Sequence, residues 1–303
     1  MRYSKPPLTF EQQADQLIER GLCAPRKDLV DRLMTVSYYR LSGYLYPYRK
    51  RDPENSKKRL DNFQPGTTLE EVWKHYTFDR RLRMVVLDAI ERIEVFTRTR
   101  LAYEHAHRYG PFAYATKPES LPDGTDKGRE WFLESARKEA KRSNERFVKH
   151  FRVRYGDCHR DLPVWMAVEI MSFGAVLTFF RSCHGDMRRA LAKPFEVHDT
   201  VFDSWLLALN TVRNVCARHA RLWNRQLGTK PKIPGRNPIW SDPVKVKGDR
   251  IFGILSICKW SLDRIAPTSA WADRLRSLLD EYPSVSRSSM GFAENWRESG
   301  IWT

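Results

Sequence analysis

Apolar residues recur at intervals of three or four along much of the chain, which is the spacing of one face of an α-helix. The clearest case is the stretch from 78 to about 103, where charged residues fill many of the other positions. Its apolar stripe consists of Leu82, Val86, Ala89, Ile93 and Phe96. No segment shows sustained alternation of apolar and polar residues with hairpin turns, the pattern of half-buried strands. The sequence therefore predicts an all-α protein, a helical bundle with N- and C-terminal helical additions.

Capping signals place the first helix near the N-terminus. Thr9 and Gln12 have the spacing of a capping box, and Gly21 follows as a helix stop. The long helix has two candidate starts of the same kind, Thr67 with Glu70 and Thr68 with Glu71. Further helices are predicted at about 27–36, 129–151, 163–182, 199–227, 249–265 and 270–281.

The run YYRLSGYLYPYR, residues 38–49, is rich in aromatic side chains. Gly43 and Pro47 interrupt it, which leaves both a bent helix and an irregular packed segment open. Packing is the default role of these rings, although interleaved tyrosine and arginine can also stack on nucleic-acid bases.

Two segments rich in turn residues divide the chain. Residues 50–66 read as a polar, charged loop, and residues 228–243 contain four prolines and read as an extended connector. The predicted organisation is an N-terminal helical segment with a basic loop (1–66), a helical core (67–228), and a connector with C-terminal helices (229–303).

Residues 162–180 are apolar and about long enough to span a bilayer. Glu169 lies in the middle of this stretch, with Ser172 and Gly174 close by. Because a charge at the bilayer centre is costly, a buried helix of a bundle is the better interpretation, and no membrane association is expected.

Charge points to the kind of partner. Lysine and arginine number 53 against 37 acids among 303 residues, a net charge of +16. Such an imbalance favours a polyanion through phosphate contacts and counterion release, so nucleic acid is the expected partner.

The cysteines bear on redox compartment and on metal binding. They are odd in number and never form a C-x-x-C pair: Cys23, Cys158, Cys183, Cys216 and Cys258. This argues against a disulfide framework, and the start MRYSKPPLTF lacks the apolar core of a signal peptide, so a cytoplasmic protein is expected. Two adjacent Cys-His pairs, at 158–159 and 183–184, match no common zinc site, and neither a metal nor another cofactor is expected.

The most informative run is RNVCARHARLWNR, residues 213–225. Cleavage of RNA without a metal needs a base for the 2′-hydroxyl, an acid for the leaving 5′-oxygen, and a cation near the phosphorane. Histidine can do the first two near neutral pH, and arginine can do the third. Arg213 and His219 therefore read as candidate catalytic residues, with Asn214 beside them.

Spacing alone does not select this run, because an arginine precedes a histidine by five to seven residues elsewhere in the chain. The other pairs are Arg98 and Arg100 with His105, Arg100 with His107, and Arg152 and Arg154 with His159. His105 and His107 are expected to be surface histidines, and Arg98 is the member of these pairs most suited to assist a site elsewhere.

Several blocks of the sequence resemble a known family, the bacterial abortive-infection proteins of the AbiD and AbiF group, within the wider superfamily of HEPN ribonucleases. The resemblance covers residues 29–232. Its blocks are YYRLSGYLYPYR (38–49), YTFDRRLRMVVLDAIERIEVFTRTRLAY (76–103), YGPFAY (109–114), VWMAVEIMSFGAVLTFF (164–180) and LNTVRNVCARHARLWNR (209–225).

The resemblance implies a HEPN-like helical bundle that pairs into a homodimer and brings two motifs together in one cleft. It also implies RNA binding or cleavage in antiphage defence, a relation to type VI CRISPR effectors, and, in some members, a toxin restrained by an RNA partner. Carried onto this sequence, Arg213 would stabilise the phosphorane, Asn214 would orient the phosphate or the histidine, and a histidine would act as acid or base.

This chain departs from the family pattern at one position. The family commonly has two successive histidines after Arg, Asn, two variable residues and Ala, whereas this chain has Arg218 followed by His219. On a helix continuing through the run, position 218 shares the polar face with Asn214, and His219 falls on the apolar side. Two interpretations of His219 remain open, a surviving catalytic imidazole and a core histidine, and Arg218 could be an inactivating substitution.

Basic residues outside the motif complete the expected site. The candidates for RNA binding are Arg80, Arg83, Arg98, Arg221, Arg225, Lys230 and Lys232. Together with the run at 213–225 they predict a metal-independent endoribonuclease of the toxin type. The alternative is a catalytically silent RNA-binding module.

Overall fold

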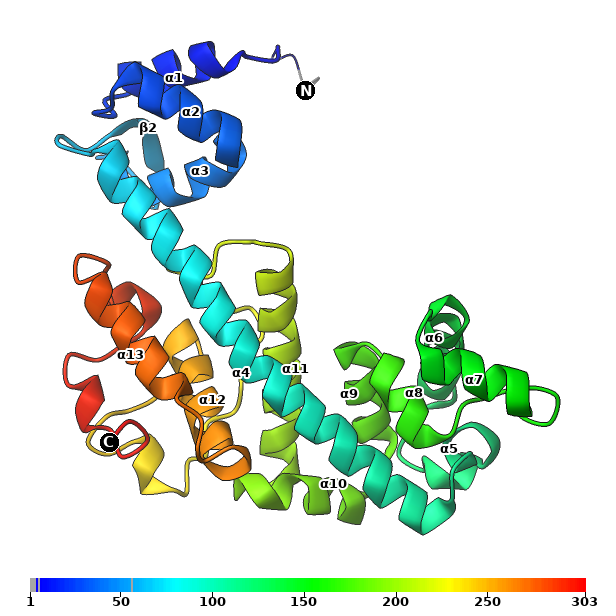
Figure 1. Cartoon of the computed structure of the whole chain (residues 1–303). Helices are drawn as coiled ribbons and strands as arrows, with labels where there is room; N and C mark the ends of the chain where they lie inside the picture. The colour runs from blue at the N-terminus through cyan, green and yellow to red at the C-terminus, as the bar shows by residue number, and fades with distance from the viewer. Residues whose placement is uncertain (1–3, 5, 56) are drawn as a thin grey trace. The chain divides into compact units, whose positions relative to one another are not determined.

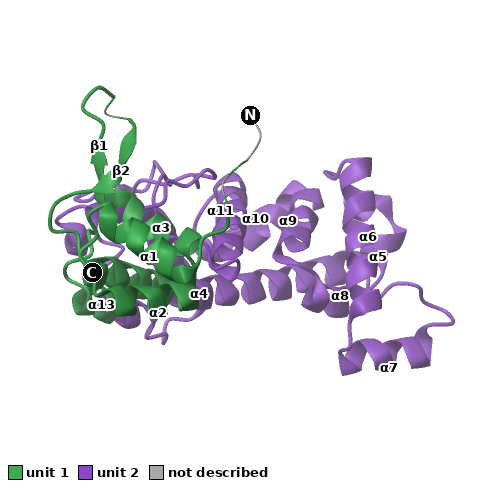
Figure 2. Ribbon diagram, turned by 90° about the horizontal axis from the view of Figure 1, so that it is seen from above, with its two compact units in different colours: residues 1–82, 277–286 green, residues 83–276, 287–303 purple. Residues whose placement is uncertain are grey.

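The computed structural model describes residues 4, 6–55 and 57–303, and helices dominate it (Figure 1). The predicted all-α class is confirmed, since one two-stranded sheet is the only sheet in that part of the chain. The chain forms two compact units (Figure 2). Unit 1 comprises residues 1–82 and 277–286, and unit 2 comprises residues 83–276 and 287–303. The division into folding domains at 66 and 228 stays a prediction.

Unit 1 contains the N-terminal helices, the sheet and parts of two helices that continue into unit 2. Its elements are α1 (Phe10–Glu19), α2 (Arg26–Val36), α3 (Tyr38–Leu45), the 3-10 turn η1 (Tyr46–Tyr48), β1 (Arg49–Arg51), β2 (Arg59–Phe63), the start of α4 (Leu69–Tyr109) and the end of α13 (Trp271–Glu281). The buried side chains of α1 and α2 include Ala14, Leu17, Leu29 and Leu33.

The predicted caps are present. Thr9 accepts a hydrogen bond from the backbone N–H of Gln12, whose side chain accepts from the N–H of Thr9. Gly21 follows α1 with φ +97°, a value that glycine adopts without strain. Of the two starts proposed for α4, the second is the observed one, because Thr68 and Glu71 bond reciprocally.

The aromatic run forms a bent helix, one of the two forms left open by its sequence. α3 ends at Leu45 and continues as the tighter turn η1, with Pro47 inside the turn. Tyr44 is buried, and its hydroxyl donates a 2.5 Å hydrogen bond to Oδ2 of Asp79. This aromatic segment is therefore anchored to the start of α4.

The sheet corrects the prediction that residues 50–66 form a polar, charged loop, because this segment contains most of a two-stranded hairpin. β1 and β2 pair antiparallel, with Arg49 opposite Phe63 and Arg51 opposite Arg59. Nη1 of Arg59 donates to the carbonyl oxygens of Pro47 and Arg49 at 2.9 and 2.7 Å. Charged side chains, not an alternating apolar face, hold this hairpin.

Unit 2 contains the rest of α4 and α13 and eight further helices. They are α5 (Ala113–Thr116), α6 (Asp126–Arg142), α7 (Arg146–Tyr155), α8 (Val164–Ile170), α9 (Phe173–Ser182), α10 (Gly185–Ala192), α11 (Asp199–Ala217) and α12 (Ile251–Ile265). Helix α9 packs against both α6 and α11. Phe179 of α9 lies at the centre of an aromatic cluster with His105, Tyr114 and Phe132.

Two predicted helices are each broken in two. The stretch 163–182 divides at Met171 because Ser172 caps a new helix, its hydroxyl accepting from the N–H of Ala175 at 3.2 Å. The stretch 129–151 divides into α6 and α7 at residues 143–145. No helix in the described residues combines the length and the apolar character needed to cross a membrane.

Candidate functional site

Helix α11 carries the first half of the sequence motif. Its apolar face is buried through Trp205, Leu209 and Val212. Arg213 and Asn214 follow on the side that is only partly covered, and Nη1 of Arg213 lies 3.4 Å from Oδ1 of Asn214. The packing of one face therefore leaves the polar pair half-exposed.

Helix α11 ends at Ala217 in a Schellman motif. The N–H of His219 bonds to the carbonyl of Cys216 at 2.9 Å, and the N–H of Ala220 bonds to the carbonyl of Val215 at 3.0 Å. In this motif the residue two places past the helix adopts a left-handed conformation, and His219 has φ +55°. Glycine or asparagine usually occupies this position.

This ending corrects the prediction that one helix continues to 227. His219 is exposed, so it is not a core histidine. The prediction that it lies on the apolar side assumed a continuous helix with about 100° of rotation per residue, and the helix ends before His219. Arg218 caps the helix and is also exposed. The side chains of Arg218 and His219 are thus both exposed to solvent.

Buried residues redirect the chain after the turn. Leu222, Trp223 and Leu227 are all at most 5% exposed. Between them Arg225 donates from Nε to the carbonyl of Arg221 at 2.7 Å, and both arginines are half-buried. The chain leaves the helix because these apolar side chains enter the core.

A hollow of about 350 Å³ joins Arg213 to residues of α4 and α8, and we call it the α4–α11 hollow. Its lining residues are Leu87, Glu91, Glu94, Val95 and Arg98 of α4, Glu169 of α8 and Arg213 of α11. Neither Arg218 nor His219 of the same chain is among them. The structure thus brings together Arg98 and Arg213, which were singled out for different roles.

Arg98 is held firmly in this hollow. Its guanidinium forms an ion pair with Glu94, one turn earlier, and donates to the carbonyl oxygens of Val168 and Glu169. The side chains of Arg98 and Glu94 are only 12% and 10% exposed. The pair is therefore largely buried and is not an ordinary surface ion pair.

Carboxylates outnumber guanidiniums in the hollow. Glu94 neutralises Arg98, whereas Glu91 and Glu169 are exposed and face the same space as Arg213. A phosphate in this hollow would have to lie next to Arg213 and away from the two exposed acids. In the sequence, Glu169 stands out only as a charge within an apolar stretch, because α8 and α4 are distant in the sequence and no spacing links them.

The other candidates for RNA binding are dispersed. Arg80 lies in unit 1 and is exposed, and Lys230 and Lys232 in unit 2 are exposed as well. Arg83 is only 5% exposed, which removes it from the set of accessible contacts.

Of the two histidines at the end of α4, His107 is exposed as expected but His105 is not. His105 is fully buried between Tyr109 and Phe179. Burial lowers its pKa to about 4, so the ring is neutral at physiological pH. His105 is thus part of the core of unit 2.

Comparison with known families decides the relationship. A family model described as Abi-like protein matches residues 31–224, more than half of the chain. The chain belongs to the Abi-like protein family. No curated protein and no solved structure gives a match. The predicted abortive-infection family is thereby confirmed, and the matched region of this Abi-like protein contains Arg98, Arg213 and His219. Membership of the HEPN superfamily and a relation to CRISPR effectors stay predictions.

Proposed function

We propose that this Abi-like protein is a metal-independent endoribonuclease of the HEPN type, acting in the cytoplasm in abortive infection and restrained by an RNA antitoxin. The observation that carries the proposal is the convergence of Arg98 and Arg213 in one hollow, next to a helix end that exposes His219. Family membership and the net charge of +16 support an RNA substrate.

The proposed chemistry uses the RNA's own nucleophile. The 2′-hydroxyl attacks the adjacent phosphorus as a base removes its proton, and the bond from phosphorus to the 5′-oxygen breaks as an acid protonates that oxygen. The products are a 2′,3′-cyclic phosphate and a 5′-hydroxyl. His219 moves the proton, Arg213 stabilises the added negative charge, and Asn214 holds the orientation of Arg213.

A homodimer would complete this arrangement. His219 does not line the hollow that contains Arg213 of its own chain, so a single copy does not combine the two groups there. A second copy would bring its own exposed helix end to the cleft and supply the proton-transfer group. Cleavage by dimers but not by monomers is therefore part of the proposal.

A second function is favoured by one specific observation. Arg218 stands at the family's first histidine position, is exposed, and cannot act as a base. If the missing histidine abolishes catalysis, the protein is a catalytically silent RNA-binding module in which arginines hold phosphates. It would bind RNA with a steep salt dependence and cleave none at any protein concentration.

One experiment separates these functions and tests the role of metal. The full chain is incubated with single-stranded RNA in EDTA, beside the same RNA carrying 2′-deoxy sugars. The proposal predicts cleavage in EDTA and none of the deoxy substrate. Loss of cleavage in EDTA would contradict the mechanism, and an intact RNA under every condition would favour the binding module.

A further inference from the structure

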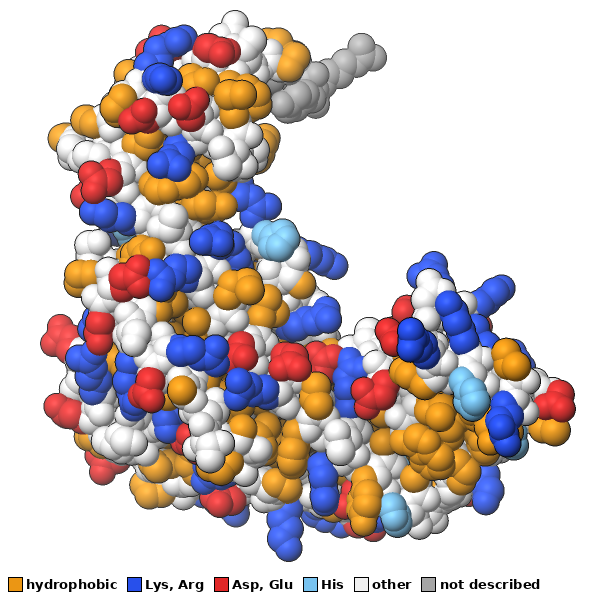
Figure 3. Space-filling model, viewed as in Figure 1, with side chains coloured by type: hydrophobic (Ala, Val, Ile, Leu, Met, Phe, Trp, Pro, Cys, Tyr) orange, Lys and Arg blue, Asp and Glu red, His pale blue; other side chains and the backbone are white. Residues whose placement is uncertain are grey.

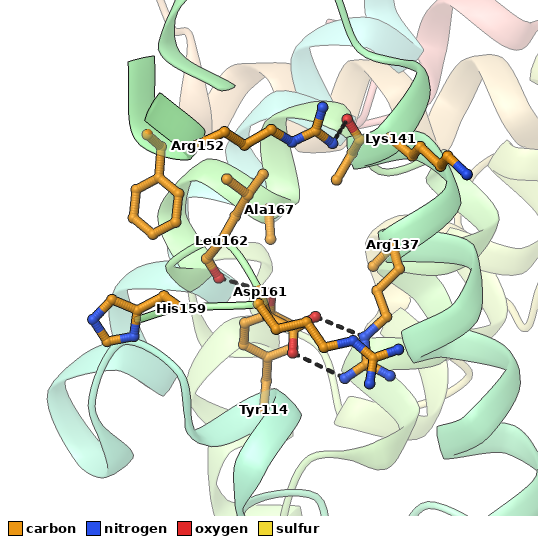
Figure 4. A pocket seen from close by; sticks show the side chains of 12 residues that line it. Tyr114, Arg137, Lys141, Arg152, His159, Asp161, Leu162 and Ala167 are labelled. Atoms are coloured by element: carbon orange, nitrogen blue, oxygen red, sulfur yellow. Dashed lines mark hydrogen bonds and ion pairs between the residues drawn. The ribbon is translucent and has the colours of Figure 1, made fainter. Parts of the chain in front are cut away.

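A second pocket of unit 2 lies between α6, α7 and the segment that precedes α8 (Figure 4). We call it the α6–α7 pocket, and it shares no lining residue with the α4–α11 hollow. Its volume is about 230 Å³. Pockets for drug-sized ligands measure roughly 300–1,000 Å³, so this pocket suits a smaller flat group.

Cationic side chains surround the pocket. Lys141, Arg152 and Arg160 line it and are exposed, and none of the three forms an ion pair within the described part of the chain. The one carboxylate in the lining, Asp161, is already engaged by Arg137 through two hydrogen bonds of 2.7 and 2.9 Å (Figure 4). The guanidinium of Arg152 also donates to the carbonyl oxygen of Ala140, but no carboxylate of the described residues neutralises it. The positive charge of all three side chains therefore remains at the rim.

The floor of the pocket is apolar. Ala136, Ala140 and Ala167 leave space because their side chains are short, and Leu162 and Phe151 complete the surface. The buried hydroxyl of Tyr114 donates to the carbonyl of Leu162 at 2.8 Å, so its proton does not need a hydrogen-bond acceptor on a ligand. Such a floor favours the face of an aromatic ring.

An aromatic stack stands at the edge of the pocket. The ring of His159, which lines the pocket and is exposed, is stacked on Phe112 with centroids 4.3 Å apart and planes 12° apart. Stacking on exposed rings is how proteins hold unpaired bases, because every base has a π-face. An apolar floor, an aromatic edge and a cationic rim together fit one nucleotide unit.

We propose that the α6–α7 pocket receives one unpaired base of single-stranded RNA, with the flanking phosphates held by Lys141, Arg152 and Arg160. A continuous strand fits better than a free nucleotide because positive charge extends beyond the pocket. Arg146, Lys149 and Arg154 of α7 are exposed, and Figure 3 shows lysine and arginine side chains gathered over α6 and α7. The inference shares with the proposed function only that the ligand is RNA.

The test measures binding of a short fluorescent oligouridine by the full chain in an Arg213→Ala background, so that cleavage does not interfere. The pocket variant is Arg152→Gln with Arg160→Gln. The control, Lys117→Gln with Lys193→Gln, removes the same charge from exposed residues that line neither the pocket nor the hollow. Circular dichroism confirms that each variant folds.

The proposal predicts that the pocket variant raises the Kd about tenfold or more, and that the salt slope falls by about 0.7 per lost phosphate contact. The control stays within about twofold of the parent. Oligouridine containing 4-thiouridine should crosslink within residues 151–162. The proposal is overturned if the pocket variant binds like the control, if the crosslink lies elsewhere, or if uridine monophosphate competes as well as the oligomer.

These outcomes are distinct from those of the cleavage experiment. A protein that binds the oligomer through the pocket and cleaves nothing refutes the nuclease but leaves this inference standing. Loss of binding in Arg213→Ala alone, with the pocket intact, would show that the hollow and not the pocket holds the strand.

Discussion

Arg98 of α4 and Arg213 of α11 line the same hollow, and each guanidinium is held by neighbours of its own. Glu94 and two backbone carbonyls hold Arg98, whereas Arg213 lies against Asn214. Charged groups whose positions are set before the substrate arrives stabilise developing charge without reorganisation. The exposed face of α4 carries mixed acidic and basic side chains in Figure 3, so these two arginines stand among ordinary surface charges.

The buried pair of Arg98 and Glu94 predicts a non-additive double-mutant cycle. Arg98→Leu leaves the Glu94 carboxylate without its partner at 10% exposure, and we expect a loss of about 3–5 kcal/mol in the free energy of unfolding. Arg98→Leu combined with Glu94→Leu should cost less than Arg98→Leu alone, because no unpaired charge remains. Urea denaturation measures the free energy of unfolding of the unaltered chain, of the two single variants and of the double variant. Additive losses would show that the two side chains act independently.

The left-handed conformation of His219 predicts that two substitutions at this residue have different effects on stability but the same effect on cleavage. His219→Ala and His219→Gly both remove the imidazole, but only glycine adopts φ +55° without strain. We expect the free energy of unfolding of the glycine variant to exceed that of the alanine variant by about 1 kcal/mol. Both variants should lose cleavage. Equal stabilities would mean that the turn imposes no strain at this residue.

Arg218→His tests whether the departure from the family pattern silences the site. Arg218 is exposed and has an ordinary backbone conformation, so histidine should fit with a change in stability within about 0.5 kcal/mol. If the arginine is inactivating, the variant cleaves single-stranded RNA faster than the unaltered chain. Equal activity of the two proteins would remove that explanation.

The burial of His105 predicts how stability changes with pH. Its pKa is about 4 in the folded protein against about 6.5 in an unfolded chain, so the unfolded state binds more protons between these values. The free energy of unfolding therefore falls as the pH drops through this window, by up to about 3 kcal/mol for this group.

His105→Phe isolates the effect, since phenylalanine can pack against Tyr109 and Phe179 but cannot bind a proton. The variant should gain stability relative to the unaltered chain between neutral pH and about pH 4.5, as measured by denaturation at each pH. A difference that stays constant with pH would contradict the assignment.

Sequence patterns determined the elements whose signals are local. Four members of the predicted stripe, Leu82, Val86, Ala89 and Ile93, are fully buried, and the fifth, Phe96, is partly buried. The capping box at Thr9 is present. These signals succeed because each depends on residues within a turn or two of one helix.

The missed features depend on contacts that spacing does not encode. The helix predicted over 199–227 is shorter than expected, because α11 ends at Ala217 through a histidine in a left-handed turn. The buried side chains of Leu222 and Trp223 determine that turn. The hollow was missed for the same reason, since only tertiary packing brings Glu169 and Arg98 beside Arg213.

The proposed cleavage mechanism is tested most directly by the chemistry of the RNA ends that the unaltered chain and Arg213→Ala produce. The mechanism predicts 2′,3′-cyclic phosphate and 5′-hydroxyl ends from the unaltered chain. It also predicts a rate about 10²–10³-fold lower for Arg213→Ala, the usual cost of removing one charge-stabilising donor. Arg100→Ala, whose ion pair with Glu104 lies outside the hollow, should cleave normally. Products with 5′-phosphate ends, or equal rates for the unaltered chain and Arg213→Ala, would contradict it.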